Sequence, residues 1–178
     1  MITLKSKSCC FFGHRKIDVT AELTKRLTQT VELLIREKGV MYFYFGSKSD
    51  FNDLCFEVVA DLKEKYPNIK RIYVRSAFPD INDSYKNYLL QSYEETYYLE
   101  KLRGAGKASY VERNREMINR SVFCVVYYDE NYTPPRRKNS KKDLTDYQPK
   151  SGTKIAYDYA VKKKCEIMNL FISNNYDF

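Results

Sequence analysis

Three short segments of the chain carry residue types that bind phosphate groups in proteins: Gly13-His14-Arg15, Gly46 to Phe51, and Ser151-Gly152-Thr153. The last two have the pattern of a glycine turn leading into a helix, where free backbone N–H groups and the helix dipole favour an anion. Arg15 can hold a phosphate through two parallel hydrogen bonds, and His14 can bond a ribose or a base. The alternatives are ordinary strand-to-helix turns with a Ser or Asp cap, and a histidine bonded to backbone carbonyls.

Two further polar residues, Arg113 and Asn114, lie in a predicted helix. Asn114 falls on the same stripe as the apolar residues Val111, Met117 and Ile118. A polar group on a buried stripe needs a partner, so this spacing favours a role in a site. For Arg113 the alternative is a solvated helix face.

A group of tyrosines follows the third predicted strand. Its members are Tyr85, Tyr88, Tyr93, Tyr97 and Tyr98. Such rings can stack on a nucleobase, and more often they pack a lid against the body of a domain. The segment 77–108 that holds them is the least periodic part of the chain. It predicts a long excursion with one helical piece, which in a compact domain is usually functional or flexible.

The elements that must position these residues alternate between apolar runs and helical periodicity. The runs predict strands over 8–12, 40–45, 69–74, 122–127 and 167–171. Helices are expected between them, with Asp18 or Thr20 capping the first and Ser49 or Asp50 the second. This order predicts an α/β, Rossmann-like three-layer sandwich with a mostly parallel central sheet of about five strands. Such sheets bind ligands at the carboxyl ends of their strands, which are the three segments above.

The length and composition favour one cytoplasmic domain. A chain of 178 residues is the size of a single domain, here 1–178. No apolar run approaches the roughly 20 residues that span a bilayer, and the apolar stretch 9–12 is shorter than a signal-peptide core. Five cysteines without C-x-x-C spacing and one histidine predict neither a metal site nor a bound cofactor. The sequence leaves open whether copies of the chain form a homo-oligomer.

The positive charge of the chain is concentrated in one place. The formal net charge is +8, and five of the basic residues lie within the Pro-rich stretch 134–142. The surrounding segment 129–150 is therefore expected to be a basic, mobile loop. We expect it to give only weak, non-specific and salt-sensitive nucleic-acid binding, and no membrane binding.

A set of motifs resembles a known family. The motifs are C-C-F-F-G-H-R-K-I at 9–17, F-Y-F-G at 43–46 with D-F at 50–51, Y-E-E-T-Y-Y at 93–98, R-N-R-E-M-I-N-R-S at 113–121, and S-G-T at 151–153 with Y-A at 159–160. Together they resemble the YpsA-like branch of the SLOG superfamily, over about residues 9–170. That superfamily has a Rossmann-like sheet and is similar to the LOG phosphoribohydrolases and the DNA-processing DprA proteins. Many of its members are thought to bind nucleotide-derived ligands.

The resemblance implies where such a ligand makes contact. The implied residues are Gly13, His14, Arg15, Gly46, Ser47, Asp50, Arg113, Asn114, Ser151, Gly152 and Thr153. Relatives usually have a Gly-Gly pair in two of these loops, where this chain has Gly46-Ser47 and Ser151-Gly152. Serine keeps its N–H group and restricts the backbone more than glycine does.

A second departure from the family bears on catalysis. The LOG enzymes have a glutamate three residues after the Gly-Thr pair, where this chain has Ala156, and alanine supplies no acid-base chemistry. Asp158 lies two residues further along and is expected to point away from the Ala156 direction. We therefore favour a domain that binds or senses a nucleotide or an ADP-ribose-like derivative. The alternatives are an N-glycosidic hydrolase or transferase using Asp50, Glu94 or Glu95, and a DprA-like nucleic-acid-binding protein.

Overall fold

Six parallel strands form the centre of the molecule in the computed structural model, which describes residues 3–76, 82–102, 104, 108–134 and 150–173. The strands are β1 (Ser8–Gly13), β2 (Tyr42–Phe45), β3 (Lys70–Arg75), β4 (Glu95–Tyr98), β5 (Phe123–Tyr127) and β6 (Glu166–Asn169). Their order across the sheet is β4-β3-β2-β1-β5-β6, and every neighbouring pair is parallel. Strands β1 to β4 thus follow one another toward one edge of the sheet. The chain then returns to the other side of β1, where β5 and β6 lie, so the strand order reverses between β1 and β5.

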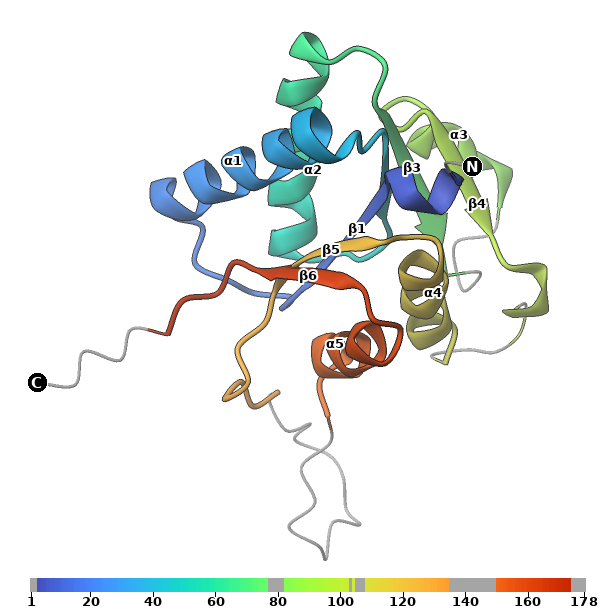
Figure 1. Ribbon diagram of the computed structural model, residues 1–178. Helices are drawn as coiled ribbons and strands as arrows, with labels where there is room; N and C mark the ends of the chain where they lie inside the picture. The colour runs from blue at the N-terminus through green and yellow to red at the C-terminus, as the bar shows by residue number, and fades with distance from the viewer. Residues whose placement is uncertain (1–2, 77–81, 103, 105–107, 135–149, 174–178) are drawn as a thin grey trace, which may run out of the picture.

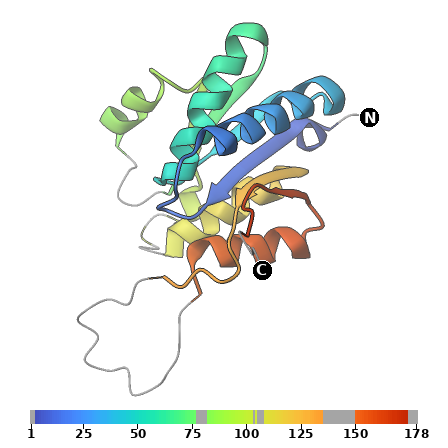
Figure 2. The same ribbon diagram turned by 90° about the vertical axis from the view of Figure 1, so that its left-hand side faces the viewer.

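Helices cover both faces of this sheet. They are α1 (Ala21–Lys38), α2 (Asp50–Lys65), α3 (Asp83–Leu89), α4 (Ala108–Asn119) and α5 (Gly152–Lys162), with short 3-10 helices at Leu4–Lys7 and Glu100–Leu102. The views in Figure 1 and Figure 2 show α1 and α2 on one face and α4 and α5 on the other. The three-layer α/β sandwich predicted from the sequence is confirmed.

Each face has its own apolar core, and the strands alternate between them. Phe11 and Phe43 pack with α1 and α2, while Phe12 and Tyr44 pack with α4 and α5. Both faces of a central parallel strand are thus buried, which explains why β1 reads as a continuous apolar run.

Local signals fix the ends of the two helices that lead to the site. The Thr20 hydroxyl accepts a hydrogen bond from the Leu23 N–H at 3.1 Å, and Ser49 caps α2 in the same way through the Asn52 N–H at 3.0 Å. Gly39 ends α1 in the left-handed conformation, with φ of 67°. Of the alternative caps considered from the sequence, the structure selects Thr20 and Ser49.

The sheet has one strand more than the sequence predicted. The additional strand, β4, lies at the edge beside β3, within the segment that was expected to hold one helical piece. Its residues, Glu95-Thr96-Tyr97-Tyr98, are half-buried or exposed and include an acid and a threonine. It therefore lacks the continuous apolar run by which the five other strands were recognised.

Two further predictions concern the basic loop and membrane-spanning helices. The basic stretch Arg136 to Lys142 lies outside the described residues. Among the helices that the structure describes, none is both long and apolar enough to cross a bilayer.

Candidate functional site

Two cavities adjoin one another at the carboxyl ends of the strands, beside the point where strand order reverses between β1 and β5. The first, which we call the central crevice, has a volume of about 650 Å³, and the second, the tyrosine pocket, about 620 Å³. Residues that line both are Arg15, Lys16, Ser47, Lys48, Ser49 and Tyr73. The two volumes therefore share one wall, and each is in the range of small-molecule sites.

The central crevice brings together most of the residues singled out from the sequence. Its predicted lining residues are Gly13, His14, Arg15, Ser47, Arg113, Asn114, Ser151, Gly152 and Thr153. They come from the ends of β1 and β2 and from α4 and α5. The structure therefore brings these distant segments together at the carboxyl ends of the strands.

The other two predicted residues lie elsewhere. Gly46 lines neither cavity and is buried beneath Arg113, where an added Cβ would lie 2.9 Å from the arginine Cδ and 2.7 Å from Met117 Sδ. Gly46 thus makes room for the Arg113 side chain. Asp50 lines the tyrosine pocket, and its carboxylate binds Lys16 Nζ at 3.2 Å and the Ile17 N–H at 3.4 Å.

Gly13 allows the end of β1 to approach the start of α2. A Cβ placed on Gly13 would lie 2.5 Å from Cδ1 of the Phe51 ring, closer than real contacts allow. In addition, the Asp50 N–H donates to the Arg15 carbonyl at 2.9 Å. The loop after β1 and the first turn of α2 are therefore held together as one wall of the site.

His14 links the ends of β1 and β5 across the point of reversal. Its Nε2 accepts a hydrogen bond from the Asp129 N–H at 2.9 Å, and its ring stacks on Tyr132 at a centroid distance of 4.1 Å. Burial lowers the pKa of His14, so the ring is neutral at pH 7. Because Nε2 accepts, the proton is on Nδ1, and this donor has no partner among the residues described. The histidine side chain is thus bonded to a backbone N–H rather than to carbonyls.

Arg113 places a buried positive charge on the crevice wall. Its side chain is only 7% exposed, and its guanidinium lies 5.5 Å from the centre of the Tyr110 ring. The Asn114 carbonyl oxygen accepts from Arg113 Nη2 at 3.3 Å. Asn114 therefore has the partner that its position on an apolar stripe requires, and both residues line the crevice.

Two helices begin at the site. Ser151 caps α5 by accepting from the Lys154 N–H at 3.1 Å, as Ser49 does for α2. The first N–H groups of a helix have no acceptor within it, and Gly152 and Thr153 in this turn line the central crevice. The positive ends of two helix dipoles are therefore directed at one cavity.

The charge of the central crevice has one sign. Its cationic residues are Arg15, Lys16, Lys48 and Arg113, and no carboxylate is among the described residues that line it. This set and the two helix starts suit an anionic ligand.

None of the carboxylates considered for catalysis lines the central crevice, although Asp50 lines the adjoining tyrosine pocket. Ala156 is buried against the sheet, and Asp158 is exposed and pairs with Lys154 Nζ at 3.4 Å, as its position on the helix predicted. Glu94 is bound by Arg71 at 2.7 Å, and the pKa of Glu94 is lowered to about 2 because hydrogen bonds from Arg71 outweigh partial burial. It stays ionised near pH 7 and does not suit a general acid.

Several lining residues were not predicted as site residues. Lys48, Tyr73 and Tyr132 line the central crevice, and Asn52 and Asp53 line the tyrosine pocket. Lys48 belongs to the candidate phosphate-binding segment Gly46 to Phe51, so its place in the sequence could have identified it as a site residue. Tyr73 is part of an apolar strand and Asn52 of a helix turn, and nothing in their spacing distinguishes them from core or cap positions.

No family model matches the chain, and no curated protein matches it. The resemblance to the YpsA-like branch of the SLOG superfamily therefore stays a prediction.

Proposed function

We propose that this protein binds a nucleotide or a nucleotide derivative such as ADP-ribose in the central crevice, as a ligand-binding or sensing domain. The observation that carries the proposal is the charge of the crevice: four cations and no carboxylate among its described lining residues. A phosphate or diphosphate is the common biological anion that suits arginine side chains and helix N-termini at once.

Three neighbouring features favour a nucleotide over inorganic phosphate. The crevice continues into a pocket of similar size, so a ligand longer than one phosphate fits. Tyrosine rings line both volumes and offer surfaces for a base. The Nδ1–H of His14 is a buried donor that suits a phosphate or ribose oxygen.

Binding is favoured over N-glycosidic hydrolysis. Such hydrolysis uses a carboxylate beside the scissile bond. The described lining of the central crevice supplies none, and α5 has Ala156 where the LOG enzymes have glutamate. In the adjoining pocket the Asp50 carboxylate is already paired with Lys16 at 3.2 Å. An assay for release of free base from nucleoside monophosphates tests this choice, and turnover at an enzymic rate would overturn it.

Calorimetry and thermal shift with AMP, ADP, ADP-ribose and cyclic dinucleotides test the proposal. A ligand at a hundred times its Kd adds about 2.7 kcal/mol, which should raise Tm by several degrees. Arg113→Ala should weaken binding about 10- to 100-fold, the value of a charge-assisted contact. Arg115→Ala is the matched control, because Arg115 lies on the same helix and pairs with Glu112 at 2.6 Å.

Two results would contradict the proposal. The first is a flat calorimetric response of the wild-type protein to the whole panel. The second is equal loss of affinity in Arg113→Ala and Arg115→Ala, because a contact in the crevice should affect only the first.

A further inference from the structure

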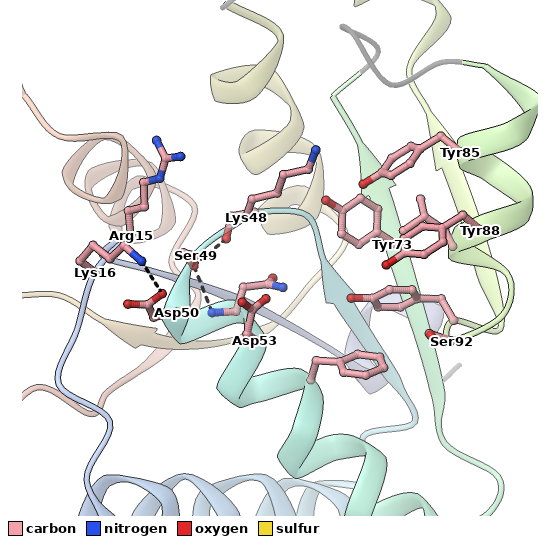
Figure 3. Close-up of a pocket in the computed structure, with 15 residues that line it drawn as sticks. Arg15, Lys16, Lys48, Ser49, Asp50, Asp53, Tyr73, Tyr85, Tyr88 and Ser92 are labelled. Carbon is pink, nitrogen blue, oxygen red and sulfur yellow. Dashed lines mark hydrogen bonds and ion pairs between the residues drawn. The ribbon is translucent and has the colours of Figure 1, made fainter.

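The tyrosine pocket differs chemically from the central crevice beside it. Besides the cations Arg15, Lys16 and Lys48, which it shares with the crevice, its lining contains aromatic rings and two carboxylates, those of Asp50 and Asp53. Figure 3 shows Tyr73, Tyr85 and Tyr88 together on one side of the pocket, opposite Asp50 and Asp53. One end of the combined site thus suits an anion, and the other offers ring faces and hydrogen-bond acceptors.

The rings of the pocket are arranged to receive a flat group. Tyr85 and Tyr88 lie 6.1 Å apart with 20° between their planes, and Tyr73 lies 5.1 Å from Tyr93. The ring of Tyr88 is 65% exposed although it is large and apolar. Aromatic faces of this kind stack with nucleobases regardless of the base sequence, because every base has a π face.

Asn52 supplies an acceptor that the protein leaves unused. The residue lies in the first turn of α2 and is 3% exposed. Its amide group lies near the Tyr93 hydroxyl, and burial raises the pKa of that hydroxyl, so the tyrosine stays protonated. Asn52 Oδ1 has no partner among the described residues. A buried acceptor without a donor is unfavourable, and a ligand N–H would satisfy it.

The neighbouring Asp53 carboxylate is a second acceptor in the pocket. Burial raises the pKa of Asp53, and the nearby charge of Asp50 adds to this effect. A hydrogen-bond donor from a ligand would favour the ionised form of Asp53. The pocket therefore offers several acceptors to a group that carries more than one N–H.

We propose that the tyrosine pocket binds the base of the nucleotide, and that the base is one with an exocyclic amino group, which donates to Asn52 Oδ1. This inference rests on the proposed function, since it takes the phosphate to lie in the central crevice. An amino group has two N–H donors on one nitrogen, one for the amide oxygen and one for a carboxylate.

Two pairs of nucleotides that differ in one amino group test the inference. They are AMP with purine riboside 5′-monophosphate, and GMP with inosine 5′-monophosphate. Calorimetry should show that, in the series that binds more tightly, the amino group improves Kd about fivefold, the value of one neutral hydrogen bond. In Asn52→Leu the difference within that pair should fall below twofold, and in Asn52→Asp, which keeps an acceptor oxygen, it should persist.

A variant that removes a stacking ring gives an independent readout, which does not depend on whether the Asn52 variants fold correctly. Tyr88→Ala should weaken binding of the better nucleotide at least fivefold and leave ribose 5-phosphate unchanged. Leu90→Ala is the control, because Leu90 is exposed beside α3 and does not line the pocket.

The outcomes separate this inference from the proposed function. Equal affinities within both pairs, or ribose 5-phosphate binding as tightly as AMP and GMP, would overturn the base assignment and leave the anion site intact. Failure of every nucleotide and of ribose 5-phosphate to bind would instead overturn the proposed function itself.

Discussion

At the scale of single residues, the shape of the site depends on two glycines that leave room for larger neighbouring side chains. Gly46 gives Arg113 the space to cross the end of β2, and Gly13 lets Phe51 approach β1. The positive charge of Arg113 is thereby held in a poorly solvated wall, where it acts more strongly on an anion than a charge in water does.

The pKa of His14 predicts a pH dependence of stability. His14 is the single histidine of the chain. Its pKa is lowered in the folded state by burial, so the unfolded chain takes up the proton first as the pH falls. The stability that His14 contributes is complete above the unfolded pKa of about 6.5, and is lost below it.

Urea unfolding at pH 7.5, 6.5 and 5.5 measures this effect. Wild-type protein should lose more stability between pH 7.5 and 5.5 than His14→Gln, whose side-chain oxygen can still accept from Asp129. A wild-type protein that gains stability over the same range relative to the variant would show that the imidazolium is favoured in the folded state, contrary to the structure.

At the scale of elements, strands and helices were more predictable than their loops. Continuous apolar runs identify buried strands such as β1, and i, i+3, i+4 spacing identifies α1 and α2. β4 was missed because its residues, Glu95 to Tyr98, do not form a continuous apolar run. Within the site, the loops after β1 and β2 could be located because a glycine directly follows each apolar run. The proximity of Asn52 to Tyr93 depends on tertiary packing, which no local sequence pattern encodes.

The cap of α2 should matter for both stability and binding. Ser49→Ala and Thr20→Ala each remove one N-cap bond and should each lower the free energy of unfolding by about 1 kcal/mol. Ser49 also lines both cavities, and Thr20 lines neither. Nucleotide affinity should therefore fall several-fold only in Ser49→Ala. Equal affinity in the two variants would show that the start of α2 does not contribute to the ligand site.

At the scale of the whole molecule, the net charge of +8 raises the question of nucleic-acid binding. Five of the basic residues lie in the stretch 134–142, and four cations lie in the central crevice. The two groups lead to different ligands: a cavity with helix starts suits a small anion, and a run of like charges gives salt-dependent attraction to a polyanion.

Neutralising the stretch separates these possibilities. The variant replaces Arg136, Arg137, Lys138, Lys141 and Lys142 with glutamine. We expect its nucleotide Kd to stay within about tenfold of wild type, and wild-type binding to DNA to be weak and to fall steeply with salt. Submicromolar DNA binding at physiological salt that disappears in the variant would favour a DprA-like role instead.

The position of β1 in the middle of the sheet has a consequence for biosynthesis. β1 leaves the ribosome well before its partner β5, which follows more than a hundred residues later, since Cys10 lies beside a cysteine 114 positions further along the chain. At about 5 to 20 residues per second, roughly 6 to 23 seconds pass before that edge of β1 can be paired. During this interval the nascent chain exposes an apolar strand edge, which is the situation in which chaperones protect a polypeptide from aggregation.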